Sequence, residues 1–164
     1  MDAIALVTEP PPAPPRPYPT LVKAGLSVDL ALCVVMGLLA LAATVQLANG
    51  AASTYPPAQA WTEAAIQYGI AGFGVTGNLL LLRRQRSGFW FACVALVFVC
   101  AGIAMAFKAL PVVVEGLEAE RKVPLLFGFV ATLVGRWLFN LGYAFVLRGA
   151  WRCLTATDTE AAHG

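Results

Sequence analysis

Four long runs of apolar residues dominate the chain, and short polar stretches separate them. The runs cover about residues 21–47, 61–82, 89–110 and 125–147, and each is about 22 residues or longer. A helix of roughly 20 apolar residues is long enough to cross the ~30 Å hydrocarbon core of a bilayer. The pattern therefore predicts an all-α polytopic membrane protein: a four-transmembrane-helix bundle with short loops, in one transmembrane domain over residues 21–153.

Prolines mark the expected ends of these segments. Pro56 and Pro57 precede the second segment, Pro111 follows the third, and Pro124 precedes the fourth. Proline lacks a backbone N–H and clashes with the preceding helical turn, so helices often begin or end beside it. We therefore expect helix boundaries at all of these positions.

Polar tails flank the four segments. The first tail, residues 1–20, contains a proline-rich run from Glu9 to Pro19, which predicts an extended polyproline-like arm. We interpret it as a stiff solvated leader, and the alternative is a docking arm for an aromatic groove on a partner. Residues 154–164 are predicted to form a polar cytoplasmic tail.

The composition excludes a soluble domain. Hydrophobic residues make up 59% of the chain and charged residues only 12%. Soluble domains carry about 25% charged residues. The net charge of +2 is too small to indicate a nucleic-acid partner.

The distribution of Lys and Arg predicts the orientation. Cytoplasmic loops of membrane proteins are enriched in these residues. Seven lie at one end of the predicted bundle and three, Lys108, Arg121 and Lys122, at the other. The seven are Arg16, Lys23, Arg83, Arg84, Arg86, Arg148 and Arg152. We therefore expect both termini in the cytoplasm. The composition, rich in Ala, Leu, Val, Gly and Arg, favours a bacterial source and hence a bacterial inner membrane.

Small residues predict how the helices pack. Membrane helices associate through small side chains that let their backbones approach closely. The second segment has two small-residue faces, so it lies between two neighbours or uses one face for a homo-oligomer. The glycines expected at helix contacts are Gly37, Gly69, Gly72, Gly74, Gly102 and Gly128.

Polar groups at membrane depth are the candidate functional residues. Asp29, Asn78, Arg136 and Asn140 all fall in the predicted cytoplasmic half or near the midplane. An unpaired charge at the centre of a membrane helix costs at least ~2.5 kcal/mol, so Arg136 needs a partner. Asp29 is the candidate, although the N-terminal tilt of helical side chains aims the two groups apart. We favour an interhelical clamp, with an ion, proton or polar-solute site as the alternative.

Other chemistries lack the residues they need. The single histidine, His163, lies in the C-terminal tail, so the segments hold neither a bis-histidine haem site nor a Ser/His/Asp set. The cysteines form no CxxC pair, and we interpret them as small buried hydrophobes; they are Cys33, Cys93, Cys100 and Cys153. We expect no catalytic residue, no metal and no cofactor.

These observations predict a non-enzymatic membrane module in contact with the lipid bilayer. It would be an accessory or assembly subunit of a membrane complex, or a self-associating bundle, with a membrane-protein partner or a second copy. The alternative is a small transporter or channel that uses the intramembrane polar cluster. An intramembrane enzyme is a third, less favoured possibility.

Overall fold

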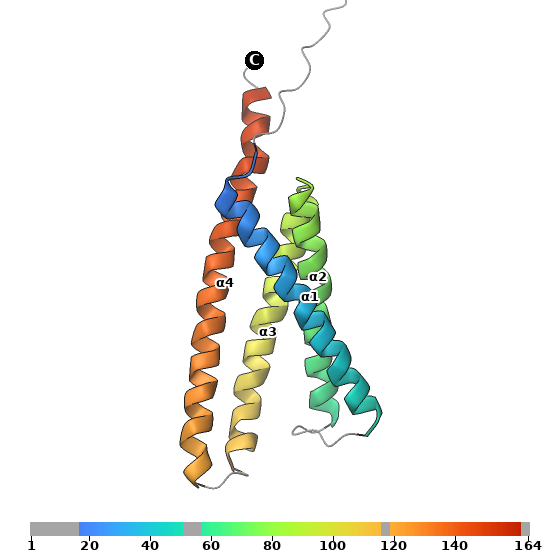
Figure 1. Ribbon diagram of the computed structural model, residues 1–164, viewed down its shortest axis with the longest axis vertical. Helices are drawn as coiled ribbons and strands as arrows, with labels where there is room; N and C mark the ends of the chain where they lie inside the picture. The colour runs from blue at the N-terminus through green and yellow to red at the C-terminus, as the bar shows by residue number, and fades with distance from the viewer. Residues whose placement is uncertain (1–16, 51–56, 116–118, 162–164) are drawn as a thin grey trace, which may run out of the picture.

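The protein folds into four α-helices, with no strand among the residues described. The computed structural model describes residues 17–50, 57–115 and 119–161. The helices are α1 (Thr20–Ala48), α2 (Pro57–Leu82), α3 (Ser87–Glu115) and α4 (Ala119–Ala161) (Figure 1). All four are long and apolar enough to cross a membrane. The predicted all-α, four-helix membrane fold is confirmed.

The proline boundaries are correct at α2 and wrong at α3 and α4. Pro57 is the first residue of α2, where its missing N–H costs no hydrogen bond. Pro111 lies inside α3 and Pro124 inside α4. Each lies within about two turns of a helix end, and membrane helices tolerate proline because neighbouring groups satisfy the freed carbonyl. α4 also continues to Ala161, so a helix covers most of the segment predicted as a polar tail.

α2 is the central helix of the bundle and packs closely against both α1 and α3. α1 runs diagonally, from the upper part of α4 at its N-terminal end to the far end of α2 (Figure 1). α4 has fewer contacts, mostly with α1 and α3. α1 and α4 therefore cross near the start of α1 and then separate.

Glycines allow the close approach at both crossings. At the α2–α3 crossing, a Cβ built on Gly77 would lie 2.7 Å from the backbone nitrogen of Ala92. At the α1–α4 crossing, a Cβ on Gly25 would lie 2.6 Å from Val146, and one on Gly149 would lie 2.9 Å from Val22. At Gly77 the added atom would meet backbone, so that crossing needs glycine, whereas at Gly25 and Gly149 a valine side chain would have to move.

A four-residue turn, residues 83–86, joins α2 to α3. Arg84 has a φ of 60°, in the left-handed region that usually belongs to glycine. The Gln85 N–H donates to the Leu80 carbonyl at 2.8 Å, and the Arg84 N–H donates to the Leu81 carbonyl at 2.8 Å. This pair of bonds is a Schellman cap, which satisfies carbonyls left over at the end of α2.

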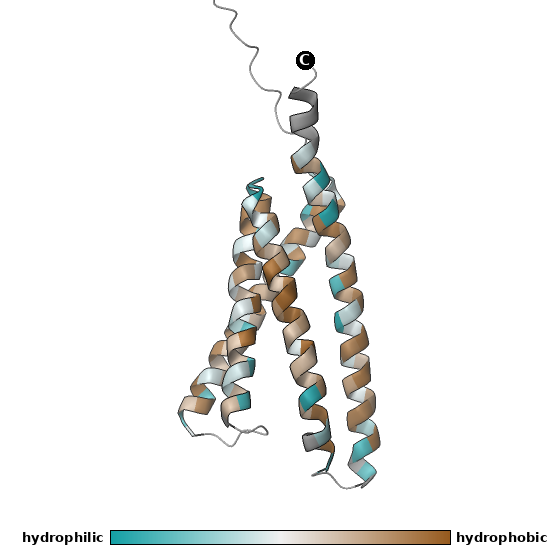
Figure 2. Ribbon diagram, turned by 180° about the vertical axis from the view of Figure 1, so that it is seen from behind, coloured by the Kyte–Doolittle hydropathy of each residue, from teal (hydrophilic) through white to brown (hydrophobic). Residues whose placement is uncertain are grey.

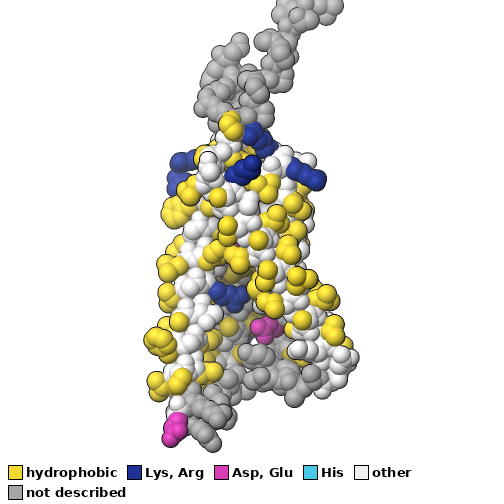
Figure 3. Space-filling view, in the orientation of Figure 1, with side chains coloured by type: hydrophobic (Ala, Val, Ile, Leu, Met, Phe, Trp, Pro, Cys, Tyr) yellow, Lys and Arg dark blue, Asp and Glu magenta, His cyan; other side chains and the backbone are white. Residues whose placement is uncertain are grey.

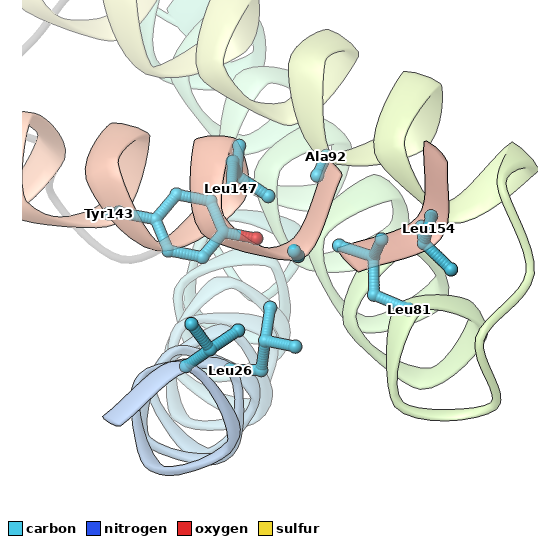
Figure 4. Close-up of a cluster of buried hydrophobic side chains, with 8 residues drawn as sticks. Leu26, Leu81, Ala92, Tyr143, Leu147 and Leu154 are labelled. Atoms are coloured by element: carbon cyan, nitrogen blue, oxygen red, sulfur yellow. The ribbon is translucent and has the colours of Figure 1, made fainter. Parts of the chain in front are cut away.

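All four helices meet in one buried apolar cluster at the end of the bundle that holds this turn (Figure 4). Leu26 comes from α1, Leu81 from α2 and Ala92 from α3. The remaining members are Val22 of α1 and Tyr143, Leu147, Ala150 and Leu154 of α4.

Polar and aromatic contacts reinforce the same end. The Tyr18 hydroxyl donates to the Leu81 carbonyl at 2.9 Å, and the Arg86 guanidinium donates to the Leu154 carbonyl at 3.2 Å. The rings of Phe89 in α3 and Trp151 in α4 lie 4.6 Å apart. The helices are therefore joined most firmly at this end.

Apolar residues are frequent along all four helices (Figure 2), and many of the large apolar side chains are exposed. Val97 is 68% exposed and Phe145 is 69% exposed, as expected for side chains that face lipid. Lys and Arg side chains gather at the end with the α2–α3 turn (Figure 3).

Candidate intramembrane polar site

Asp29 and Asn78 are the only polar or charged side chains that the described part of the chain buries. Asp29 of α1 is 8% exposed and Asn78 of α2 is fully buried. The Asn78 amide Nδ2 donates to the Asp29 carboxylate Oδ2 at 2.6 Å. The structure therefore brings together two of the four residues of the predicted polar cluster.

Two further side chains complete this network. The Tyr143 hydroxyl of α4 donates to Asn78 Oδ1 at 2.8 Å, and the Cys33 thiol donates to Asp29 Oδ2 at 3.6 Å. Both were missing from the predicted cluster. Helical spacing held a signal for them, because Cys33 is four residues after Asp29 and Tyr143 is three residues after Asn140.

The network has a fixed direction. A carboxylate only accepts hydrogen bonds, so the Asn78 amide must present its NH₂ to Asp29. Its oxygen then faces Tyr143, which donates. The side chains of Asp29, Asn78 and Tyr143 thus join α1, α2 and α4 through two hydrogen bonds in a region with little water to replace them.

A cavity of about 260 Å³ lies beside this network. All four helices contribute to its wall: Asp29, Leu32, Cys33 and Met36 from α1, Ile70 from α2, Val99 from α3, and Gly135, Arg136, Phe139 and Asn140 from α4. The wall is mainly apolar. Its polar groups are the Asp29 carboxylate on the α1 side and the Arg136 and Asn140 side chains, one turn apart, on the α4 side.

Arg136 forms no hydrogen bond and no ion pair with any residue that the structure describes. The Asp29–Arg136 pair considered from the sequence therefore does not form, although both side chains line the same cavity. Asp29 instead accepts hydrogen bonds from Asn78 and Cys33.

The six glycines predicted at helix contacts divide into two groups. Gly37, Gly69, Gly74 and Gly102 face neighbouring helices at Ala71, Phe98, Cys33 and Ile66 respectively. Gly72 and Gly128 have no described atom within 4 Å of an added Cβ. These two leave small, uncovered patches on α2 and α4.

Within residues 17–50, 57–115 and 119–161, no group of three His, Cys, Asp or Glu residues is placed to hold a metal ion. All four cysteines are free thiols.

Comparison with known proteins finds no matching family model, no matching curated protein and no matching solved structure. The function has to be inferred from the chemistry and packing of the helices themselves.

Proposed function

We propose that the protein is a non-enzymatic accessory or assembly module of a larger complex in a bacterial inner membrane, with both termini in the cytoplasm. The observation that carries the proposal is an uncovered face of α4. This face is formed by Gly128, Gly135 and Gly142, and it is called the glycine face below.

The glycine face has the spacing of a helix-packing surface. Its members are seven residues apart, as is Gly149, which packs against α1 at the crossing. Residues seven apart lie on nearly the same side of a helix. Gly149 has a helix against it, whereas an added Cβ on any of the other three meets no described atom within 4 Å. The same packing surface therefore continues along α4 after α1 has left it.

A helix from another chain would cover this face. Small residues favour helix association in membranes. Within the apolar span of α4, Lys122–Thr155, an 18-residue window has no buried residue in this chain. The buried residues of the span, Tyr143, Leu147, Ala150 and Leu154, belong to the apolar cluster at the end with the α2–α3 turn. A partner helix would supply contacts along the part of α4 that this chain leaves uncovered.

The charge distribution supports the orientation. Lys and Arg side chains gather at the end of the bundle with the α2–α3 turn (Figure 3). Positively charged loops are retained in the cytoplasm. The described N-terminal residues and the end of α4 lie at this same end (Figure 1).

The experiment is native electrophoresis of the protein extracted with its own lipids. We expect wild type to migrate as a complex larger than one chain, and Gly142→Leu to release a single chain. Leu141→Phe, on the neighbouring exposed position, is the control that adds bulk outside the glycine face. A single chain in wild type, or an unchanged complex in Gly142→Leu, would contradict the proposal.

The second candidate is a small transporter or channel, and the cavity beside Asp29 favours it. The polar residues Asp29, Arg136 and Asn140 line this cavity, and Asn78 holds Asp29 in place. Uptake of labelled solutes by proteoliposomes tests this candidate. Transport that persists in Asp29→Asn and Arg136→Leu variants would exclude the cavity as the route.

A further inference from the structure

We propose that the cavity binds a small zwitterion with an apolar body, of the size and chemistry of an apolar amino acid. The inference goes beyond the accessory role, and it requires neither a partner chain nor transport. It rests on the cavity that all four helices line, and on the separation of its opposite charges.

The two charged groups of the cavity are on different walls. Asp29 is on α1 and Arg136 is on α4, and no ion pair joins them. A guest between them that carries a carboxylate toward Arg136 and an ammonium toward Asp29 complements both. The guanidinium is the better-suited donor for a carboxylate, because its planar fork forms two parallel hydrogen bonds.

Asp29 is held ready for such a contact. The hydrogen bonds from Asn78 of α2 and from Cys33, one turn along α1, both end on its Oδ2 oxygen and fix the carboxylate. Asp29 also lines the cavity, where its carboxylate can accept a hydrogen bond from a guest. Asn140, one turn along α4 from Arg136, adds an amide that can both donate and accept.

A guest with a single charge fits less well. A lone carboxylate would bind Arg136 but would face the Asp29 carboxylate across the cavity. A lone ammonium would meet the guanidinium in the same way. Like charges at close range in a medium of low dielectric constant repel strongly, whereas a zwitterion satisfies both walls at once.

The size and lining of the cavity agree with this class of guest. Its volume of about 260 Å³ is the volume that about eight or nine water molecules occupy in the liquid, at ~30 Å³ each. An amino acid with a branched aliphatic side chain has a similar number of non-hydrogen atoms. The remaining wall is apolar and includes Met36, Ile70 and Phe139, which suit such a side chain.

Equilibrium binding to the purified full chain in detergent tests the proposal. The probe is radiolabelled L-leucine, with L-valine and L-phenylalanine tested in the same way. The competitors are 4-methylpentanoate, which lacks the ammonium, and 3-methylbutylamine, which lacks the carboxylate. A hydrogen bond to a charged group contributes about 1.5–3 kcal/mol. Each of these two one-ended analogues, which lack one of the two charged groups, should therefore bind about 10- to 100-fold more weakly than leucine.

Two variants connect binding to the cavity. Arg136→Leu should weaken leucine binding by at least about tenfold and abolish its advantage over 3-methylbutylamine, which should bind more tightly because the repelling guanidinium is gone. Arg148→Leu removes a charge at the exposed end of α4 and should bind leucine like wild type. Asp29→Asn keeps an acceptor for Asn78 and should abolish the advantage of leucine over 4-methylpentanoate.

Three results would overturn the proposal. The first is no saturable binding of any of the three amino acids at about 1 mM. The second is equal binding of leucine and its one-ended analogues to wild type, which needs no variant to fold. The third is leucine binding that Arg136→Leu leaves unchanged.

Discussion

The hydrogen bond between Tyr143 and Asn78 gives the sharpest test of how the helices are held together. Asn78 is fully buried and bonds to α1 on one side and α4 on the other. Asn78→Leu keeps a similar volume but removes both bonds. Interhelical hydrogen bonds in membranes contribute about 0.6 kcal/mol on average and up to ~1.7 kcal/mol. We expect Asn78→Leu to lower the free energy of unfolding by about 1–3 kcal/mol.

A double-mutant cycle isolates the bond to α4. Tyr143→Phe removes only the hydroxyl, and the double variant with Asn78→Leu should cost less than the sum of the two single changes. The difference should equal about 0.6–1.7 kcal/mol, the contribution of this one bond. Unfolding by titration with a denaturing detergent, followed by tryptophan fluorescence, measures all three variants.

Tyr68→Phe is the matched control. Its hydroxyl donates to Thr44 at 3.1 Å, but this bond is exposed at the surface of the bundle. We expect a smaller change in the free energy of unfolding than for Tyr143→Phe. Additive losses in the cycle, within about 0.3 kcal/mol, would refute the argument that this bond joins α4 to α2.

Three further predictions concern packing, orientation and pH. Gly77→Ala should destabilise the bundle because its Cβ would lie 2.7 Å from the backbone of α3. Gly72→Ala should be neutral or stabilising because no described atom lies within 4 Å of its added Cβ. Thermal unfolding in detergent compares the two variants, and equal losses of stability would contradict the described packing. A reporter that is active only outside the cytoplasm should be silent after Gly164 and active when inserted at Ser53, and the reverse pattern would overturn the orientation. Burial raises the pKa of Tyr18 above its ordinary value of 10.0, and Arg84 opposes the shift. The stability that Tyr18 contributes should therefore be complete below pH 10 and decline as the pH rises further. Melting temperatures measured over a pH series should lose this decline in Tyr18→Phe, and an identical decline in the variant would exclude Tyr18 as its source.

The four spans were predictable because hydropathy depends on local composition alone. The positions of Pro111 and Pro124 inside helices were not predictable from the sequence. A proline removes a backbone hydrogen bond, but in a membrane helix neighbouring groups can satisfy the freed carbonyl, so the helix continues past it. The sequence thus predicted which segments are helical better than where each one stops.

The polar site was predictable in its residues but not in its pairings. Asp29 and Asn78 stood out because polar groups are rare at membrane depth. Their contact, and the separation of Asp29 from Arg136, depend on the angle at which α1 crosses α2 and α4, which spacing along one helix does not encode. Tyr143 was less visible because tyrosine in a membrane helix is equally suited to packing.

The crossing of α1 and α4 also has a mechanical consequence. Gly25 and Gly149 place it close to the start of α1, so α4 extends about 30 residues, or roughly 45 Å, from this pivot to Ala119. A rotation of about 1° at the pivot displaces the far end of α4 by about 0.8 Å over that length. The Tyr143 hydroxyl bond lies only six residues from Gly149, on the same arm as Ala119 but close to the pivot. A small change in the length of that hydrogen bond is therefore expected to produce a larger displacement at the Ala119 end of α4. The distance between α1 and α4 at that end of the bundle is the quantity most sensitive to the bond.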